Sequence, residues 1–280
     1  MPSPLEQVHR FTRAARSNFY YAFLTLPRDR RDGIVAVYAF CRAADNAVDD
    51  APDPASAARE LSFWRAELER AFAGSATHPV AVRAAEAARQ FGLERRHFEE
   101  VLDGVGWDIA PRRFARFEEL AHYCDLVAGA VGRLTVRVLG HREPEADEYA
   151  RQLGLALQLT NILRDLGPDA AAGRFYLPQD DLARFELDEA GVVGSAPRRL
   201  DLLRFEAARA QQHFEAARAF GRRWPRDLCA AEAMAAIYRR LLERIERAGF
   251  PTGPRRVELP RPLKAWIAAR AFVRGRIVRA

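Results

Sequence analysis

Lysine is almost absent from this sequence. Of the 44 basic residues only Lys264 is a lysine, and it lies in a basic C-terminal segment. Because an imine with a carbonyl substrate needs a lysine amine, most Schiff-base chemistry is excluded. Arginine supplies the positive charge instead, and its planar guanidinium matches the geometry of carboxylates and phosphates.

Features of secreted, membrane-spanning and nucleic-acid-binding proteins are also missing. No apolar run of about 18 residues would span a membrane, and basic residues interrupt the N-terminal segment, which is therefore not a secretion signal. The net charge of +6 comes without a zinc-finger or RNA-binding motif, so nucleic acid is not an expected partner. Three widely spaced cysteines, without zinc or redox spacing, indicate reduced thiols in a cytoplasmic protein: Cys41, Cys124 and Cys229.

The chain predicts one all-α domain over residues 1–280. Its hydrophobic content of 49% can fill one large core, no strand pattern appears, and no Pro/Gly/Ser-rich linker divides it. A central helix carries the apolar run that begins near residue 153. The other expected helices cover residues 4–26, 29–49, 55–73, 79–91, 94–105, 117–139, 198–222, 226–248 and 262–278, with a flexible connection at 191–197.

Four polar residues recur on one face of the apolar central helix. At about 100° per residue, Gln158, Asn161, Asp165 and Asp169 fall within about 80° of one another. The rest of this helix is rich in leucine and isoleucine, so the polar stripe is expected to face an internal cavity rather than solvent.

A second stripe combines Tyr38, Arg42, Asp45 and Asp49 within about 60° of one helical face. A single pair of aspartates one turn apart is usually solvated or half of an ion pair. Two such pairs in apolar helices instead predict facing carboxylates. Carboxylate oxygens suit Mg²⁺, with Mn²⁺ as an alternative, and the octahedron of Mg²⁺ is completed by water and phosphate oxygens, so a diphosphate is the expected ligand.

These motifs resemble those of the squalene and phytoene synthases over nearly the whole chain. The central stretch, 153–178, is similar to the second signature of that family, and 123–132 to the first. Residues 38–50 resemble the first aspartate-rich motif, and 18–26 the N-terminal substrate segment. The resemblance implies a class I isoprenoid synthase fold, a helical bundle around a central cavity.

The implied reaction is the Mg²⁺-dependent head-to-head condensation of two prenyl diphosphates. The overall pattern is most similar to the bacterial presqualene diphosphate synthases of hopanoid biosynthesis, which join two farnesyl diphosphates and leave reduction to a downstream isoprenoid enzyme. NADPH is therefore not expected as a cofactor. Phytoene, squalene and dehydrosqualene synthases are alternatives, as is a non-catalytic member that serves as a binding or assembly protein.

The resemblance also implies roles for individual residues. The metal ligands would be Asp45, Asp49, Asn161, Asp165 and Asp169. Diphosphate would contact Arg42, Arg164 and Arg174, with structural ion pairing as the alternative for each arginine. Tyr38 and Tyr123 would act in catalysis with Arg42, or would only pack. The remaining candidates for substrate binding are Asn18, Gln158 and Tyr176.

The sequence departs from the family pattern at two positions. Asn46 replaces an aspartate of many relatives but points away from the face of Asp45 and Asp49. Pro168 replaces an acidic residue and, beside Gly167, is expected to kink the helix, which makes Asp169 a less certain ligand than Asp165.

Two further features allow more than one interpretation. Small residues at 128–132 either permit close helix packing or leave room for a prenyl chain, and the resemblance favours room. The basic C-terminal segment from residue 263 either packs on the core or contacts the inner face of the membrane.

Overall fold

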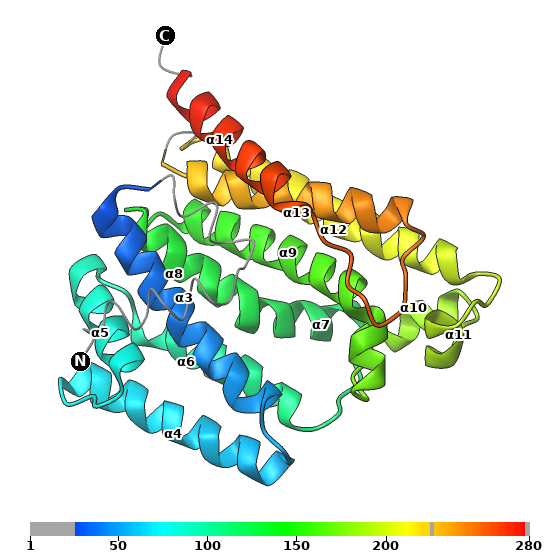
Figure 1. Cartoon of the computed structure of the whole chain (residues 1–280), viewed down its shortest axis with the longest axis horizontal. Coiled ribbons are helices and arrows are strands. Elements are labelled where there is room, and N and C mark those ends of the chain that lie inside the picture. Colours follow the sequence, from blue (N-terminus) through cyan, green and yellow to red (C-terminus); the bar gives the residue numbers. More distant parts are fainter. Residues whose placement is uncertain (1–25, 225–226, 278–280) are drawn as a thin grey trace.

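The structure is a computed structural model that describes residues 26–224 and 227–277, and every regular element in these ranges is a helix (Figure 1). The all-α prediction is confirmed. Asn18 and the helix expected at 4–26 lie outside the described residues, and the assignment of residues 1–280 to one domain stays a prediction. None of the helices in the described ranges has both the length and the apolar character needed to cross a membrane.

The observed helices follow the expected ranges to within a few residues. They are α3 (Arg28–Asp49), α4 (Pro54–Ala73), α5 (Pro79–Phe91), α6 (Arg95–Gly106), η1 (Trp107–Ile109), α7 (Phe117–Cys124), η2 (Asp125–Gly129), α8 (Ala130–Val138), α9 (Pro144–Ala171), α10 (Gln179–Arg184), α11 (Glu189–Val193), α12 (Arg199–Gly221), α13 (Cys229–Arg247) and α14 (Arg261–Ile277).

Two expectations about local structure differ from what is observed. The helix expected at 117–139 contains a π-helical turn, η2, between α7 and α8. The π turn inserts an extra residue per turn, which periodicity alone does not reveal. The connection expected at 191–197 begins inside a short helix, α11, because the Asp188 side chain caps it by accepting a hydrogen bond from the Gly191 amide (2.7 Å).

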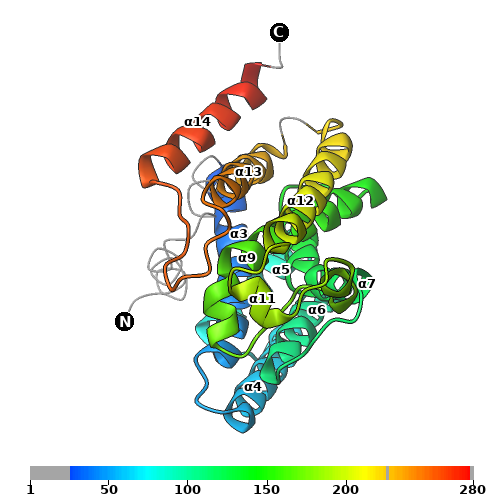
Figure 2. The same ribbon diagram turned by 90° about the vertical axis from the view of Figure 1, so that its right-hand side faces the viewer.

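Helix α9 lies at the centre of the bundle, with α3, α8, α12 and α13 around it (Figures 1 and 2). Its apolar residues are buried in one continuous core that runs from Leu26 to Ala268. A helix that is apolar on most of its circumference needs neighbours on several sides, and this requirement places the polar stripe of α9 inside the protein.

Glycines bring α9 into near-backbone contact with η2 and α8. A Cβ atom added at Gly154 would lie 2.7 Å from the Gly129 amide nitrogen, and one at Gly132 would lie 2.8 Å from the Ala150 carbonyl oxygen. These small residues therefore serve close packing, while Ala128 and Gly132 also line a cavity. The small residues at 128–132 therefore both permit close helix packing and leave room in the cavity.

Helix α9 continues through Pro168 and ends only at Ala171. The last turn is closed by the Arg174 amide, which donates to the Asp169 carbonyl (2.8 Å). Gly167 has a separate reason for being small, because an added Cβ would lie 2.0 Å from the Thr252 carbonyl oxygen. The segment after α13 thus rests directly on the backbone of α9 beside the proline.

Replacing Gly167 by alanine is expected to destabilise the protein by about 1 to 3 kcal/mol, because the new methyl group overpacks this contact. Urea unfolding followed by circular dichroism measures the change. Gly253→Ala is the matched control in the same contact, since nothing lies within 4 Å of its added Cβ. Equal stability of the Gly167→Ala variant and the wild type would contradict the close approach.

Candidate active site

A cavity of about 210 Å³ lies between α3, α8, α9 and α13. Its wall is mostly apolar, with contributions such as Ile34, Leu157 and Met234. The polar lining comes from the two predicted stripes, which the fold brings to the same cavity: Tyr38, Arg42 and Asp45 from α3, and Gln158 and Asn161 from α9.

The Asp45 carboxyl group carries unbalanced negative charge. Burial raises its pKa from 3.8 to about 7, the Arg42 guanidinium opposes this rise, and the nearby carboxylates Asp49 and Asp108 add to it. A carboxylate in such surroundings gains most from a cation that enters the cavity.

The Asn161 side chain presents an oxygen without a partner. Its Nδ2 donates to the Gln158 Oε1 (3.2 Å). The Asn161 Oδ1 is buried and has no hydrogen-bond partner among the described residues. Because buried polar atoms are normally satisfied, this oxygen indicates a place for a cation or a donor group.

Asp165 and Asp169 lie one turn apart at the C-terminal end of α9, in different charge environments. Asp165 accepts from Arg164 Nε (2.9 Å) and Nη2 (2.6 Å), and the Arg256 Nε lies 2.9 Å from it. Burial, followed by the charge of Asp165, raises the pKa of Asp169 to about 6, although Arg174 and Arg256 oppose the rise. The arginines therefore neutralise one aspartate more completely than the other.

Arg174 connects the loop after α9 to the end of α3. Its Nη1 lies 2.8 Å from Asp49 Oδ1, and its positive charge also opposes the rise that burial causes in the pKa values of Asp108 and Asp169. One guanidinium thus acts on carboxylates from three segments of the chain. Both Arg164 and Arg174 are engaged in ion pairs, so a diphosphate would have to share or replace their present partners.

Asp108 is a site residue that the sequence did not single out. It lies on η1, and its carboxylate accepts hydrogen bonds from the hydroxyl groups of Tyr123 (2.7 Å) and Tyr176 (2.9 Å). The two rings stack with centroids 5.5 Å apart, and Trp107 stacks on Tyr123 while Phe114 stacks on Tyr176. The sequence gives little signal for Asp108, which follows Gly104 and Gly106 and belongs to neither polar stripe.

Charge and hydrogen bonding keep Tyr123 and Tyr176 protonated beside the Asp108 carboxylate. Burial raises the pKa of Asp108, while the hydrogen bonds from both tyrosines lower it. Burial and the neighbouring carboxylate raise the pKa values of Tyr123 and Tyr176, so both phenols keep their protons. The two hydroxyls therefore point their protons at Asp108 rather than into the cavity, and Tyr123 is not part of the cavity wall.

The predicted ligands present the chemistry of a magnesium site but not a closed metal cage. Within residues 26–224 and 227–277, no three His, Cys, Asp or Glu residues lie close enough to hold one ion. Hard oxygen atoms, the Asp45 carboxylate and the unpartnered Asn161 Oδ1 among them, nevertheless fit Mg²⁺, which takes only one or two carboxylates and completes its shell with water and phosphate oxygens. Asn46 lines a different hollow, with Trp64 and His78, so it does point away from Asp45.

Two helices that bear aspartates, α3 and α9, meet at an apolar cavity, which is the arrangement expected of the isoprenoid synthase fold. The sequence model of the squalene/phytoene synthase family matches residues 12–262. The chain therefore belongs to the squalene/phytoene synthase family, whose members are prenyltransferases, and the predicted resemblance is confirmed.

Curated relatives within this family have different products. The chain is 37% identical to a phytoene synthase of Mycobacterium tuberculosis, over 96% of this chain and 91% of that protein. It is 36% identical to a presqualene diphosphate synthase of Rhodopseudomonas palustris, over 85% and 86% of the two chains. Such similar values support the family chemistry and do not separate the two products.

Solved structures have the same fold. A dehydrosqualene synthase superposes with a TM-score of 0.87 at 26% identity, covering 96% of this chain and 95% of that chain. Squalene synthase HpnC from Alicyclobacillus acidocaldarius superposes with a TM-score of 0.82 at 28% identity, covering 89% and 95%. The roles assigned to individual site residues stay predictions.

The stability of the metal-free protein is expected to depend on the titration of Asp45. Its pKa in the folded protein, about 7, lies above the ordinary 3.8, so the folded state binds more protons than the unfolded chain between these values. The free energy of unfolding should therefore fall as the pH rises from about 4 to about 7. Urea unfolding in the presence of EDTA across this range measures the slope.

Asp45→Asn should reduce this slope without removing it, because Asp169 and Glu206 titrate in overlapping ranges, near 6 and 8. Asp50→Asn, at the exposed end of the same helix, is the control and should leave the slope unchanged. An Asp45→Asn variant with the full wild-type slope would show that this carboxyl group does not titrate as described.

Proposed function

We propose that this protein joins two farnesyl diphosphates head to head, forming presqualene diphosphate and releasing one diphosphate. The observation that carries the proposal is the polar end of the cavity, where Asp45 and the unpartnered Asn161 oxygen from two helices meet above an apolar wall. Family membership supports the reaction class. The farnesyl chain length and the cyclopropyl product rest on the sequence pattern.

The cavity has a different surface for each part of a prenyl diphosphate. The apolar wall takes the hydrocarbon chain, and the acidic end with Arg42 takes the charged group. Asp45, Asp49, Asn161, Asp165 and Asp169 would hold Mg²⁺. When bound there, Mg²⁺ supplies positive charge that stabilises the departing diphosphate. Arg42 donates hydrogen bonds to phosphate oxygens, and within the described residues no ion pair engages it.

The apolar wall also protects the reaction from water. Breaking the allylic C–O bond of the first substrate leaves a carbocation, which water would quench in an open site. The double bond of the second substrate then donates its electrons to form a carbon–carbon bond, and loss of a proton closes the cyclopropane ring. Tyr38 lies in this wall and is the candidate to orient the leaving diphosphate or receive the proton.

The Asp108 cluster would position the polar end rather than react. Tyr123 and Tyr176 lock the carboxylate of Asp108, and Asp108 in turn contributes to the raised pKa values of Asp45 and Asp169. A fixed negative charge behind the aspartate pairs increases the attraction for cations in the cavity. We infer for Tyr123 this supporting role in place of direct contact with substrate.

Phytoene synthase is the second candidate, because the Mycobacterium tuberculosis relative carries that name at 37% identity. It would use geranylgeranyl diphosphate in the same cavity. Squalene and dehydrosqualene synthases are less favoured alternatives. A presqualene product would need a separate reducing enzyme downstream, and we propose no role for NADPH in this protein.

Incubating the purified protein with farnesyl diphosphate and Mg²⁺, with and without NADPH, is expected to give the same cyclopropyl diphosphate of thirty carbons, identified by mass spectrometry. Geranylgeranyl diphosphate in a parallel reaction tests the second candidate. A forty-carbon product only from the longer substrate would replace the presqualene proposal by phytoene synthesis. Product from neither substrate would favour a non-catalytic role.

Asp49→Asn and Asp165→Asn are each expected to lower kcat/KM by about 100-fold or more, because each removes a carboxylate that would hold Mg²⁺ at the diphosphate-binding end. Asparagine keeps the shape of the side chain, so the helical circular dichroism should change little. Asp50→Asn is the neighbouring control with an exposed side chain. Wild-type turnover in both site variants would contradict the assignment of these aspartates as metal ligands.

A further inference from the structure

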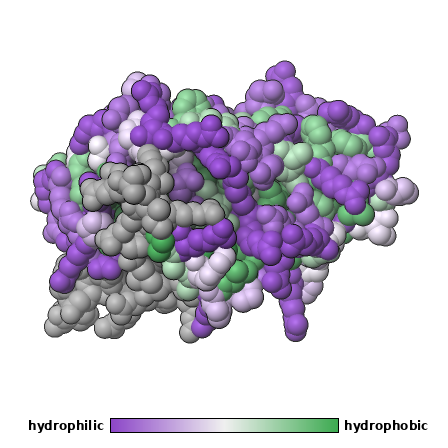
Figure 3. All heavy atoms as spheres, turned by 90° about the horizontal axis from the view of Figure 1, so that it is seen from above, coloured by the Kyte–Doolittle hydropathy of each residue, from purple (hydrophilic) through white to green (hydrophobic). Residues whose placement is uncertain are grey.

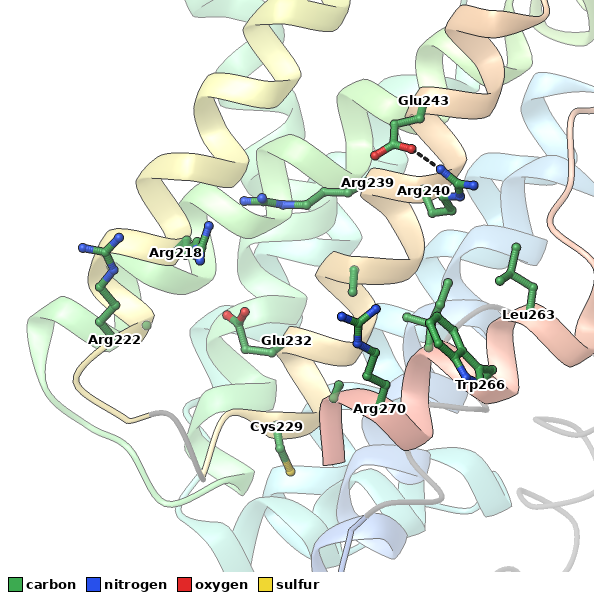
Figure 4. Close-up of a pocket in the computed structure, with 14 residues that line it drawn as sticks. Arg218, Arg222, Cys229, Glu232, Arg239, Arg240, Glu243, Leu263, Trp266 and Arg270 are labelled. Atoms are coloured by element: carbon green, nitrogen blue, oxygen red, sulfur yellow. Dashed lines mark hydrogen bonds and ion pairs between the residues drawn. The ribbon is translucent and has the colours of Figure 1, made fainter. Parts of the chain in front are cut away.

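A second hollow lies on the other side of α13 from the cavity, between α12, α13 and α14 (Figure 4). We refer to it as the arginine groove. Figure 4 shows Arg218 on α12 and Arg222 just after it at one side and Trp266 and Arg270 on α14 at the other, with Glu232 of α13 between them. Nothing in the proposed condensation uses these residues.

The arginines of the groove differ in how their charge is used. Arg239 and Arg240 are paired, with Glu215 and Glu243 respectively. Arg218 and Arg222 are exposed, and neither forms an ion pair with any residue in the described ranges. Arg270 lies over the Trp266 ring, with its guanidinium carbon 5.3 Å from the ring centroid. The groove therefore offers positive charge to an external anion.

The net positive charge of the chain comes from its C-terminal sequence. Residues 261–280 contain six of the 44 basic residues and none of the 38 acidic ones. The first 260 residues therefore carry 38 of each sign and no net charge. All of the net charge of +6 belongs to the segment that forms and follows α14, so long-range attraction to an anionic surface would orient the protein with this end forward.

The same end exposes apolar side chains. Of the large apolar residues exposed in the described ranges, the two most exposed are Trp266 (57%) and Val273 (51%), both on α14. Trp266, Arg270 and Val273 follow one another at helical spacing on one face, while Lys264, Ile267 and Ala268 are buried on the other. Figure 3, which looks onto the molecule from above the view of Figure 1, shows a mainly hydrophilic surface interrupted by separate apolar patches.

We propose that the arginine groove and the exposed face of α14 bind an anionic phospholipid bilayer. Arginine charge would contact lipid phosphates, and the indole of Trp266 would enter the interface between head groups and acyl chains, the position that tryptophan favours in membranes. An acidic protein would match the charge alone, whereas a bilayer matches both the charge and the exposed Trp266 and Val273. The proposal does not depend on which prenyl product is formed.

Helix α13 places this surface next to the cavity. Ala230, Met234 and Tyr238 line the cavity from one face of α13, while Glu232, Ala236 and Arg240 line the groove from another. One hydrogen bond joins the two walls, because the hydroxyl of the cavity residue Tyr149 donates to Glu232 Oε1 (2.9 Å). A bilayer held at the groove would therefore lie one helix away from the compartment for the prenyl chains.

Sedimentation of the full chain with vesicles tests the proposal. Vesicles of phosphatidylcholine alone are compared with vesicles that contain about one third phosphatidylglycerol, at about 0.1 M and 0.5 M NaCl. We expect binding to the anionic vesicles only, and its loss at the higher salt concentration. No binding, or equal binding to both kinds of vesicle, would overturn the proposal.

Two sets of variants locate the contact. Arg218→Glu with Arg222→Glu should weaken binding by about tenfold or more, since each basic residue near an anionic surface contributes roughly a factor of five. Arg59→Glu with Arg89→Glu changes the net charge equally on α4 and α5, away from the groove, and is the matched control. Similar weakening by both pairs would assign binding to overall charge and reject the groove.

Tryptophan fluorescence gives an independent readout. The chain has four tryptophans, and emission should shift to shorter wavelength when anionic vesicles are added. Trp266→Phe should remove this shift while circular dichroism stays unchanged, because the side chain is exposed. An undiminished shift in the variant would show that Trp266 does not enter the bilayer.

Discussion

The burial of several carboxylates within a helical interior is the constraint on which this structure depends. Each buried aspartate is costly in an apolar medium unless a cation or donor compensates it. The protein compensates some of them with its own groups, such as Arg164 and Arg256 for Asp165 and two phenols for Asp108. It leaves Asp45 and Asp169 with raised pKa values, and this remaining imbalance makes the site receptive to cations. The near absence of lysine fits this arrangement, because guanidinium groups can contact two oxygens at once.

Much of this arrangement could be predicted from helical spacing. Tyr38, Arg42 and Asp45 of α3 and Gln158 and Asn161 of α9, which share a face in the sequence, do line one cavity, whereas Asp49, Asp165 and Asp169 lie outside its wall. Periodicity cannot reveal groups outside regular helices, and Asp108 lies on a short turn, η1, after a helix that ends in glycine. It also cannot tell whether an arginine is already paired. Arg164 and Arg42 looked alike in the sequence, yet Arg164 is held by Asp165 whereas Arg42 lines the cavity.

The roles of the glycines also could not be predicted from the sequence alone. The sequence left open whether small residues at 128–132 make room for a ligand or allow helices to approach. The answer depends on which atoms face Gly132 and Gly154, and those atoms come from another helix. Pro168 is comparable, because its sequence context predicts a kink beside Gly167, and α9 stays helical through it to Ala171. The role of the small residues and the course of α9 at Pro168 depend on contacts between helices, which the local sequence pattern does not show.

Because α13 forms a wall of both the cavity and the arginine groove, a shift of this helix would alter both hollows. A ligand that shifts this helix, or the Tyr149–Glu232 hydrogen bond across it, changes both walls together. Thermodynamic linkage then requires symmetry: if a filled cavity strengthens attachment at the groove, attachment strengthens retention in the cavity by the same factor. Release of a product from the cavity would in that case be tied to detachment of the protein from its surface.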